Sequence, residues 1–330
     1  MKYSIEFVLK VNEIYHDIEE SEYEEKHPEI FQNEPSRWQK IGTAFIANNP
    51  EKICLLDIGS GTGFVPIQIG NFLKKGDLFV CSDISANILN ACKANISDEK
   101  FKCHFKYLKL DGKKIDLESN TFDYITLNSV LHHIPDLPIF FKEINKLLKT
   151  NGRLIIGHEP NKLFYTHKFL WNNYRLVSYI FDRKQFTAAI LRKLKLHKIA
   201  GRIYKGFNQE VKPRDRVVED ANKRLLEEGI IKTPLTADQM CEIVDIHSPT
   251  AGGYHKDRGI DIAEILRDYL PGFEIEYLET YNHLCKISSK NRFTKWYNSV
   301  LGKIFHGTGS TFLMVLKKGT PLRDEAGEVF

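Results

Sequence analysis

The sequence predicts an α/β protein built on a doubly wound, mostly parallel β-sheet of seven strands. Three observations predict it. Short apolar runs alternate with helical patterns from Ile53 to Gly157, the first run ends in a glycine-rich turn, and the alternation resumes after Gly259. Repeated βα units of this kind imply parallel strands joined by right-handed crossovers.

The predicted elements follow one another at short intervals. Strands are predicted at residues 53–58, 78–83, 101–110, 122–128, 153–157, 273–281 and 310–318. Helices are predicted at 64–73, 86–95, 139–148, 260–270 and 293–304. Continuous apolar runs such as Ile53–Ile58 are typical of parallel strands buried on both faces. The dipeptides Asn151-Gly152 and Pro271-Gly272 mark turns.

Three parts of the chain are distinguished by their periodicity. Residues 1–50 have helical spacing, residues 51–160 and 259–330 form the sheet domain, and residues 161–258 form a helical insertion between strands five and six. The insertion is aromatic at first and basic later. We expect it to lie over the carboxyl ends of the strands, where open α/β sheets bind ligands.

The composition excludes several classes of protein. Of 330 residues, 42% are hydrophobic and 27% charged, which excludes collagen-like, disordered and disulfide-scaffold chains. The six cysteines contain no CxxC pair and are expected to be reduced and mostly buried. Acids occur in the first twenty residues and charges interrupt every long apolar run, so we expect a cytoplasmic protein without a leader or membrane span.

Charge is unevenly distributed along the chain. Residues 183–216 hold eleven Lys or Arg and two acids, a net charge of +9 within an overall +4. This segment is either a solvated helix face or a contact for an anionic partner, namely a membrane surface, a phosphorylated or carboxylated substrate, or RNA.

The strongest motif is the run LLDIGSGTGF at residues 55–64. Its glycines allow a tight turn and a close approach of a ligand to the backbone. The GxGxG spacing, preceded by Asp57, disfavours a dinucleotide and favours a ligand with an ammonium group. Asp83 ends the second strand, where a carboxylate binds ribose hydroxyls or, alternatively, caps the next helix. Asp111-Gly112 ends the third strand and is either an adenine contact or an ordinary turn.

Taken together, five segments resemble a class I S-adenosylmethionine-dependent methyltransferase, especially the branch of ubiquinone/menaquinone-biosynthesis and related small-molecule enzymes. They are LLDIGSGTGF, VCSDIS, LKLDG, FDYITLNSVLHHIPD and LLKTNGRLIIGHEPN. The resemblance implies a Rossmann-like sheet, S-adenosyl-L-methionine as cofactor, and N-terminal helices that close over it as a lid, with His16, Tyr23 and Trp38 on them. It covers residues 53–161 and, more loosely, the last two strands.

The resemblance also implies roles for individual residues. Asp57 would meet the methionine ammonium of the cofactor, and Asp83 would hold its ribose with Ile84 packed on the adenine. The remaining cofactor residues implied are Gly59, Ser60, Gly61, Gly63, Asp111, Gly112, Asn128 and Ser129. The sequence Asn128-Ser129-Val130-Leu131 departs from the Asp/Asn-Pro-Pro-aromatic loop of enzymes that methylate amines of DNA bases, which disfavours that activity.

A hydroxyl acceptor must lose a proton, so a base is expected at the strand ends. The candidates are His132, His133, His158 and Glu159. His132 and His133 could instead only shape the pocket. His247 and His255 lack the spacing of a metal site, so no metal is expected.

We therefore predict methyl transfer to a small molecule, at oxygen rather than nitrogen or carbon. The alternatives are an RNA methyltransferase that uses the basic insertion, a non-catalytic cofactor-binding partner protein, and a nicotinamide-dependent dehydrogenase. The expected partner is a small-molecule substrate, nucleic acid is disfavoured, and peripheral membrane contact through the basic insertion is one option. The sequence leaves the oligomeric state open.

Overall fold

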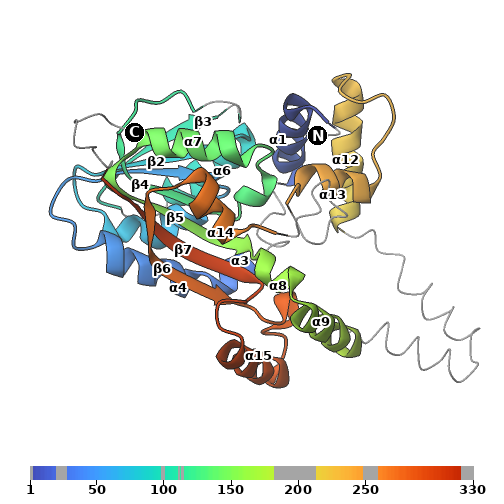
Figure 1. The fold of residues 1–330 in the computed structure, drawn as a ribbon. Helices are drawn as coiled ribbons and strands as arrows, with labels where there is room; N and C mark the ends of the chain where they lie inside the picture. The colour runs from blue at the N-terminus through green and yellow to red at the C-terminus, as the bar shows by residue number, and fades with distance from the viewer. Residues whose placement is uncertain are drawn as a thin grey trace, which may run out of the picture.

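The computed structural model describes residues 3–19, 28–97, 101–110, 112, 115–181, 213–247 and 259–320. Its centre is a seven-stranded sheet with the order β3-β2-β1-β4-β5-β7-β6 (Figure 1). The strands are β1 (Cys54–Ile58), β2 (Leu78–Asp83), β3 (His104–Lys109), β4 (Phe122–Asn128), β5 (Leu148–Pro160), β6 (Phe273–Tyr281) and β7 (Thr311–Lys318). The first five are parallel, and β7 is antiparallel to both β5 and β6. The predicted fold class is confirmed.

Helices cover both faces of the sheet, as a doubly wound fold requires. On one face α4 (Pro35–Ile41), α5 (Phe64–Ile69) and α6 (Ala86–Ser97) bury a cluster that includes Trp38. On the other face α7 (Leu137–Leu147), α14 (Ile262–Glu264) and the π-helix η5 (Ile265–Tyr269) bury a second cluster around Phe141. Three short elements complete this part of the chain: α3 (Pro28–Asn33), the π-helix η2 (Gly42–Ile46) and the 3-10 helix η3 (Gly70–Phe72).

The strands begin and end within three residues of the predicted bounds, except at the start of β5. At its other end β5 continues to Pro160 instead of Gly157. β5 starts at Leu148 instead of Arg153, and its pairing with β4 shifts between Phe122 and Tyr124. Asn151 takes up the irregularity with a φ of 63°. Asn tolerates this left-handed conformation better than most residues, so the Asn-Gly pair, predicted as a turn, makes a bulge inside the strand.

One helical unit, which we call the cap, consists of α1 (Ile5–Glu19), α12 (Pro213–Glu227) and α13 (Ala237–Val244). It has its own apolar core, in which Val11 and Ile14 of α1 meet Leu225 of α12 and Ile243 of α13. The cap lies beside the sheet domain, at the edge formed by the carboxyl ends of the parallel strands (Figure 1). It therefore combines the start of the chain with part of the insertion.

A second helical unit consists of α8 (Lys162–Thr166), α9 (Lys168–Phe181) and α15 (Arg292–Ile304), next to the 3-10 helix η6 (Cys285–Ile287). Phe164, Leu170 and Val177 pack with Leu284 and Leu301 in a small core. The described helices of the predicted insertion thus separate into two units, because α12 and α13 join α1 whereas α8 and α9 join α15.

The cysteines and the apolarity of the helices were also subjects of prediction. All six cysteines are free, with Cys81, Cys92 and Cys103 buried and the others partly buried. Among the described residues, no helix has the length and apolarity needed to cross a bilayer.

Candidate functional site

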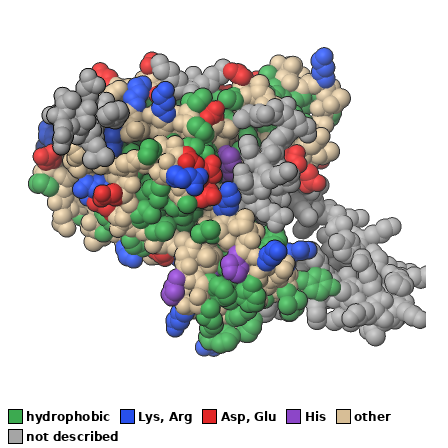
Figure 2. Space-filling view, viewed as in Figure 1, with side chains coloured by type: hydrophobic (Ala, Val, Ile, Leu, Met, Phe, Trp, Pro, Cys, Tyr) green, Lys and Arg blue, Asp and Glu red, His purple; other side chains and the backbone are tan. Residues whose placement is uncertain are grey.

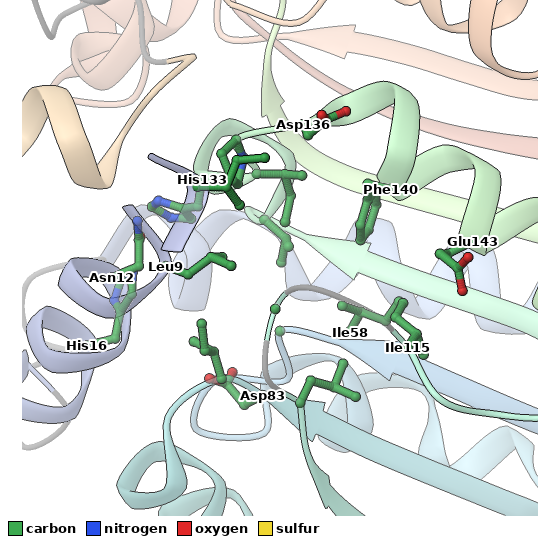
Figure 3. Close-up of a pocket in the computed structure, with 18 of the residues that line it drawn as sticks. Leu9, Asn12, His16, Ile58, Asp83, Ile115, His133, Asp136, Phe140 and Glu143 are labelled. Carbon is green, nitrogen blue, oxygen red and sulfur yellow. The ribbon is translucent and has the colours of Figure 1, made fainter. Parts of the chain in front are cut away.

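A cavity of about 440 Å³ lies where the carboxyl ends of β1, β2 and β4 meet helix α1 and helix α7. Figure 3 shows Leu9, Asn12 and His16 of α1 on one side, Phe140 and Glu143 of α7 on the other, and Asp83 at the strand ends. Most of the lining is apolar. Neither Lys nor Arg is among the described residues that line it. Its acidic residues are Glu6, Asp83, Asp136 and Glu143. The cavity therefore favours cationic or neutral ligands over phosphates.

The glycine turn between β1 and α5 forms the floor of this cavity. Gly59, Gly61 and Gly63 have φ values of 69°, 55° and 101°, which non-glycine residues rarely adopt. A Cβ on Gly59 would lie 2.4 Å from Cγ2 of Val130. Gly59 and Gly61 line the cavity, whereas Ser60 and Gly63 do not. Ser60 is buried, and its hydroxyl donates to the carbonyl of Asp57 at 3.2 Å.

Asp83 joins this turn to the end of β2. One carboxylate oxygen accepts from the backbone N–H of Gly61 at 3.0 Å, and the other from that of Ser85 at 3.0 Å. Burial raises the pKa of Asp83, while these hydrogen bonds oppose the change. The residue lines the cavity beside Ile84 and Gly112. Asp83 does not cap α6 directly, because the side chain that accepts from a helix N–H, that of Ile88 at 3.1 Å, is the hydroxyl of Ser85. Asp83 fixes the backbone just before this cap, and its role toward a ribose stays a prediction.

Asp57 is buried in β1 and does not line the cavity. Its Oδ1 accepts from Oγ1 of Thr126 at 2.6 Å, but its Oδ2 has no hydrogen-bond partner. Burial raises the pKa of this carboxyl to about 7. A buried carboxylate oxygen without a partner is costly, and a nearby cation would stabilise it. This orphan atom fits a ligand with an ammonium group near the glycine turn.

Asn128, the last residue of β4, and Ser129, which follows it, line the cavity. Nε1 of Trp38 donates to Oδ1 of Asn128 at 2.9 Å, and a Cβ on Gly157 would lie 2.8 Å from the indole. Trp38 is fully buried, so it orients Asn128 from within the core and is not part of a lid. Of the described residues 3–19 and 28–50, only those of α1 border the cavity, because α4 packs in the core on one face of the sheet. A lid formed by the N-terminal helices stays a prediction, and the described lining residues place α1 in it.

Three histidines gather at the side of the cavity that faces the cap. His133 lines the cavity, and its ring centroid lies 5.0 Å from that of His16 and 4.0 Å from that of His132. Its Nδ1 lies 2.8 Å from the carbonyl oxygen of Val244. Burial, with His132 and His16 nearby, lowers the pKa of His133 well below its usual value. The lowered pKa favours the neutral ring. In that form Nδ1 carries the proton, because it faces the carbonyl oxygen of Val244 and, at 3.4 Å, Oδ1 of Asp245, and a carbonyl oxygen only accepts. Nε2 is therefore the basic atom.

Glu159 is completely buried and acts inside the loop that follows β4. Its carboxylate accepts from the backbone N–H groups of Val130, Leu131 and His132 at 2.5, 2.7 and 3.3 Å, and lies 2.9 Å from Nδ1 of His132. It does not line the cavity. The structure thus corrects its expected role as a base, since all of its acceptor capacity holds the loop that carries His132 and His133.

His158 points away from the cavity as well. It lies 3.3 Å from Glu34, a buried acid, and does not line the cavity. Its φ of 55° marks the register shift in the pairing of β5 with β7. The prediction of a base at His158 is therefore corrected too: successive residues of a strand face opposite sides of the sheet, so His158 and Glu159 diverge.

The cap is fastened to the sheet domain by polar contacts that the sequence did not reveal. Asp17 of α1 accepts from the Ser85 hydroxyl on one side and from Arg224 of α12, at 2.9 Å, on the other. Glu13 lies 2.6 Å from Lys109 at the end of β3. Ser85 is two residues after Asp83, so these contacts couple the position of α1 to the strand end that borders the cavity.

His132, His133 and Asp245 form the one group of described residues whose ligand atoms are close enough to hold a metal ion, within 4.8 Å of one another. Nδ1 of both histidines already contacts Glu159 or Val244. The expected absence of a metal stays a prediction.

Several predicted features lie outside the described residues. They are Asp111, Tyr23, His255 and most of the basic segment 183–216. His247 is described: its Nε2 contacts the carbonyl oxygen of Ile134 at 3.0 Å, next to the cavity lining.

The family comparison covers the part of the chain that holds the first five strands. The sequence profile of the family described as "Methyltransferase domain" matches residues 56–156. A ubiquinone/menaquinone biosynthesis C-methyltransferase of Cellvibrio japonicus is 26% identical over 102 residues, which are 31% of this chain and 41% of that protein. A 2-phytyl-1,4-naphtoquinone methyltransferase of Trichormus variabilis is 24% identical over 126 residues, 38% of this chain and 55% of that protein.

The chain thus spans about half the length of these curated relatives. Among solved structures, a putative methyltransferase of Bacillus halodurans is similar with a TM-score of 0.43 and 16% identity, over 87% of this chain and 99% of that one. Residues 56–156 thus match a methyltransferase domain, and the sheet order and the glycine turn are those predicted for the class I S-adenosylmethionine-dependent enzymes. The cofactor that these findings indicate is S-adenosyl-L-methionine.

Proposed function

We propose that the chain transfers a methyl group from S-adenosylmethionine to an apolar small molecule that carries an ionisable hydroxyl group. The observation that carries the proposal is His133, a neutral imidazole whose Nδ1 is held by Val244 and whose ring lines the same cavity as the glycine turn and Asp83. The cofactor supplies an activated methyl group, so the protein has to orient the reactants and accept a proton.

The residues of the glycine turn and the strand ends are proposed to bind the cofactor. Asp83 would accept hydrogen bonds from the ribose hydroxyls, with Ile84 and Gly112 beside the adenine, because all three border the cavity. Asp111 would belong to the adenine site as well. Asp57 would stabilise the methionine ammonium through its unpartnered Oδ2. Gly59, Gly61, Asn128 and Ser129 would lie along the methionine part, while Ser60 and Gly63 shape the turn.

His133 is proposed as the base that deprotonates the acceptor. A neutral imidazole with Nδ1 donating to a carbonyl presents Nε2 as a proton acceptor, and a lowered pKa keeps it unprotonated at neutral pH. His132 and Glu159 act as positioning residues, because they fix the loop that carries His133.

The lining of the cavity supports this class of acceptor. Apolar side chains dominate, and the absence of Lys and Arg among the described lining residues disfavours RNA and dinucleotides. The named relatives include C-methyltransferases of quinone biosynthesis, which supports a phenol-like or hydroquinone-like acceptor. Loss of the hydroxyl proton activates both the oxygen and the adjacent ring carbons of such a molecule, so transfer to oxygen stays a prediction.

We further propose that residues 51–160 and 259–330 bind the cofactor, while α1, α12 and α13 cover the acceptor. Two observations on the cap support this division. Its residues Asn12 and His16 line the cavity, and the carbonyl oxygen of Val244 contacts Nδ1 of His133.

The test is to incubate the purified chain with isotopically labelled S-adenosylmethionine and a panel of phenols and hydroquinones. The proposal predicts a product heavier by one methylene unit, and NMR then distinguishes a methyl ether from a ring methyl. A product formed only from RNA, or cofactor binding without any product from panels or cell extracts, would contradict it.

A further inference from the structure

The outer surface of α9 and α15 combines large apolar side chains with basic ones. Its apolar members are Phe169, Leu176, Tyr179, Ile180, Phe293, Trp296 and Ile304, all of them exposed. Trp296 is 61% exposed and Phe169 is 54% exposed, values that are unusual for aromatic residues. Figure 2 shows these hydrophobic atoms gathered over α15 and α9, with Lys or Arg at their margin. We call these residues, with the basic ones named below, the α9/α15 surface.

This exposure is a consequence of how the two helices pack. The inner faces of α9 and α15 bury Leu170, Val177 and Leu301 against each other, and the hydroxyl of Tyr297 donates to Oδ1 of Asn173 at 2.8 Å. Each helix therefore has a buried face, and the apolar residues of the α9/α15 surface are additional ones that lie outside this face and stay exposed. Contiguous exposed apolar surface of this kind marks an interaction site.

The charges around the surface have a single sign. Residues 162–181 and 282–310 contain eight Lys or Arg and no Asp or Glu. Five of these are exposed residues of α9 and α15, namely Lys168, Arg175, Arg292, Lys295 and Lys303. Within the described part of the chain, none of the five has an ion-pair partner. Such a surface attracts an anionic partner.

The combination favours a lipid surface over a protein. Protein interfaces are depleted in Lys, whereas helices that lie in a membrane interface insert Trp, Phe and Leu and extend Lys and Arg toward the headgroups. A nucleic acid would pair its phosphates with the Lys and Arg side chains and stack its bases on the aromatic rings. It would not account for the exposed aliphatic side chains of Leu176, Ile180 and Ile304.

We infer that the α9/α15 surface docks this protein on an anionic bilayer as a peripheral membrane contact. α8 and α9 follow the end of β5, and α15 follows the end of β6, which is parallel to β5 through β7. The surface thus lies at the same edge of the sheet as the cavity. This inference is independent of the proposed methyl acceptor, and it uses residues other than the basic segment 183–216.

The experiment is co-sedimentation of the full chain with vesicles of phosphatidylcholine alone or with about one third phosphatidylglycerol. We expect binding to the anionic vesicles, release by salt, and a blue shift of Trp296 fluorescence that brominated lipids quench. Phe293→Ser and Trp296→Ser should each weaken binding about tenfold, since burial of one large apolar side chain contributes at least about 1.5 kcal/mol. Lys295→Glu combined with Lys303→Glu should also weaken it.

Matched controls separate this surface from the rest of the molecule. Ile275→Ser removes an exposed apolar side chain of β6, and Lys75→Glu reverses an exposed charge just before β2, at the opposite edge of the sheet. Both should bind vesicles like the unmodified chain. Absence of vesicle binding, equal binding by Trp296→Ser, or dimerisation or nucleic-acid binding that the same substitutions abolish would overturn the inference. Cofactor affinity, measured in parallel, reports on the methyltransferase site separately.

Discussion

Nδ1 of His133 lies 2.8 Å from the backbone carbonyl oxygen of Val244. His133 belongs to the loop after β4, whereas Val244 is the last residue of α13 in the cap. A residue of the cap therefore sets the tautomer of a histidine carried by the sheet domain. Under the proposal that His133 is the base, this contact makes the cap part of the chemistry, in addition to bordering the cavity.

Replacement of His133 by Asn tests its role as a base. The Asn amide retains a donor for Val244 but has no basic atom. We expect turnover to fall at least about 100-fold, the usual contribution of a general base, with S-adenosylhomocysteine affinity unchanged. Methyl transfer and calorimetric binding are measured on the same preparation.

His283 provides the matched control. Its Nε2 contacts the carbonyl oxygen of Phe305 at 3.0 Å, and burial lowers its pKa, but it does not line the cavity. His283→Asn should retain full turnover. Equal losses in both variants would show that only folding was affected.

Asp83→Ala should weaken S-adenosylhomocysteine binding about tenfold to 100-fold, because each lost charge-assisted bond contributes about 1.5–3 kcal/mol. Asp77→Ala is the control: Asp77 is also a buried acid that accepts backbone N–H groups, from Ile53 and Lys74, but it lies at the opposite edge of the sheet. That variant should lose stability and keep its affinity. An Asp83 variant with normal affinity would remove this residue from the ribose site.

Cofactor affinity should depend on pH through Asp57. Because burial raises its pKa to about 7, the carboxyl is protonated below that pH in the free protein. A bound ammonium would lower the pKa, so binding releases a proton, and affinity should rise by up to about tenfold per pH unit until about pH 7 and level off above it. Calorimetry in buffers of different ionisation enthalpy measures the released proton.

Asp57→Asn is the test of that assignment. The variant should bind S-adenosylhomocysteine more weakly at pH 8 and lose the proton release. If the unmodified chain binds equally well at pH 6 and pH 8 without proton release, Asp57 does not meet the ammonium.

The periodicity of the sequence predicted most of the sheet, because buried parallel strands read as continuous apolar runs and the glycine turn has a specific spacing. Asp83 is predicted from its position at the end of a strand, where open α/β sheets bind ligands, whereas Asn128 is implied by the family resemblance. The irregular start of β5 at Leu148 was not predictable, since Asn151-Gly152 suits a turn and a bulge equally well.

The remaining site residues depend on contacts distant in sequence. Trp38 reaches Asn128 across 90 residues, and His133 reaches Val244 across 111. No local pattern encodes such pairs. His158 and Glu159 were misjudged because their position after a strand suggested a site, whereas the strand continues to Pro160 and directs Glu159 into the core and His158 toward Glu34.

Glu159→Ala should destabilise the fold by at least about 3 kcal/mol, because three backbone N–H groups lose their buried acceptor. The control is Glu276 of β6, which forms a partly exposed ion pair with Arg153. Glu276→Ala should lower the free energy of unfolding by at most about 1 kcal/mol. Denaturant unfolding measures both variants. Similar small effects would mean that the loop after β4 does not depend on Glu159.

The most direct test of the account is a calorimetric titration of S-adenosylhomocysteine into the unmodified chain and into Gly61→Val. Gly61 lines the cavity with a φ of 55°, so a branched side chain there would be strained and would occupy the ligand's place. Gly229→Val is the control, because Gly229 has a similar φ of 69° with open space around its Cβ position. The account predicts one bound ligand per chain for the unmodified protein and the control, and none for a folded Gly61→Val. Absence of binding to the unmodified chain, or normal binding by Gly61→Val, would contradict it.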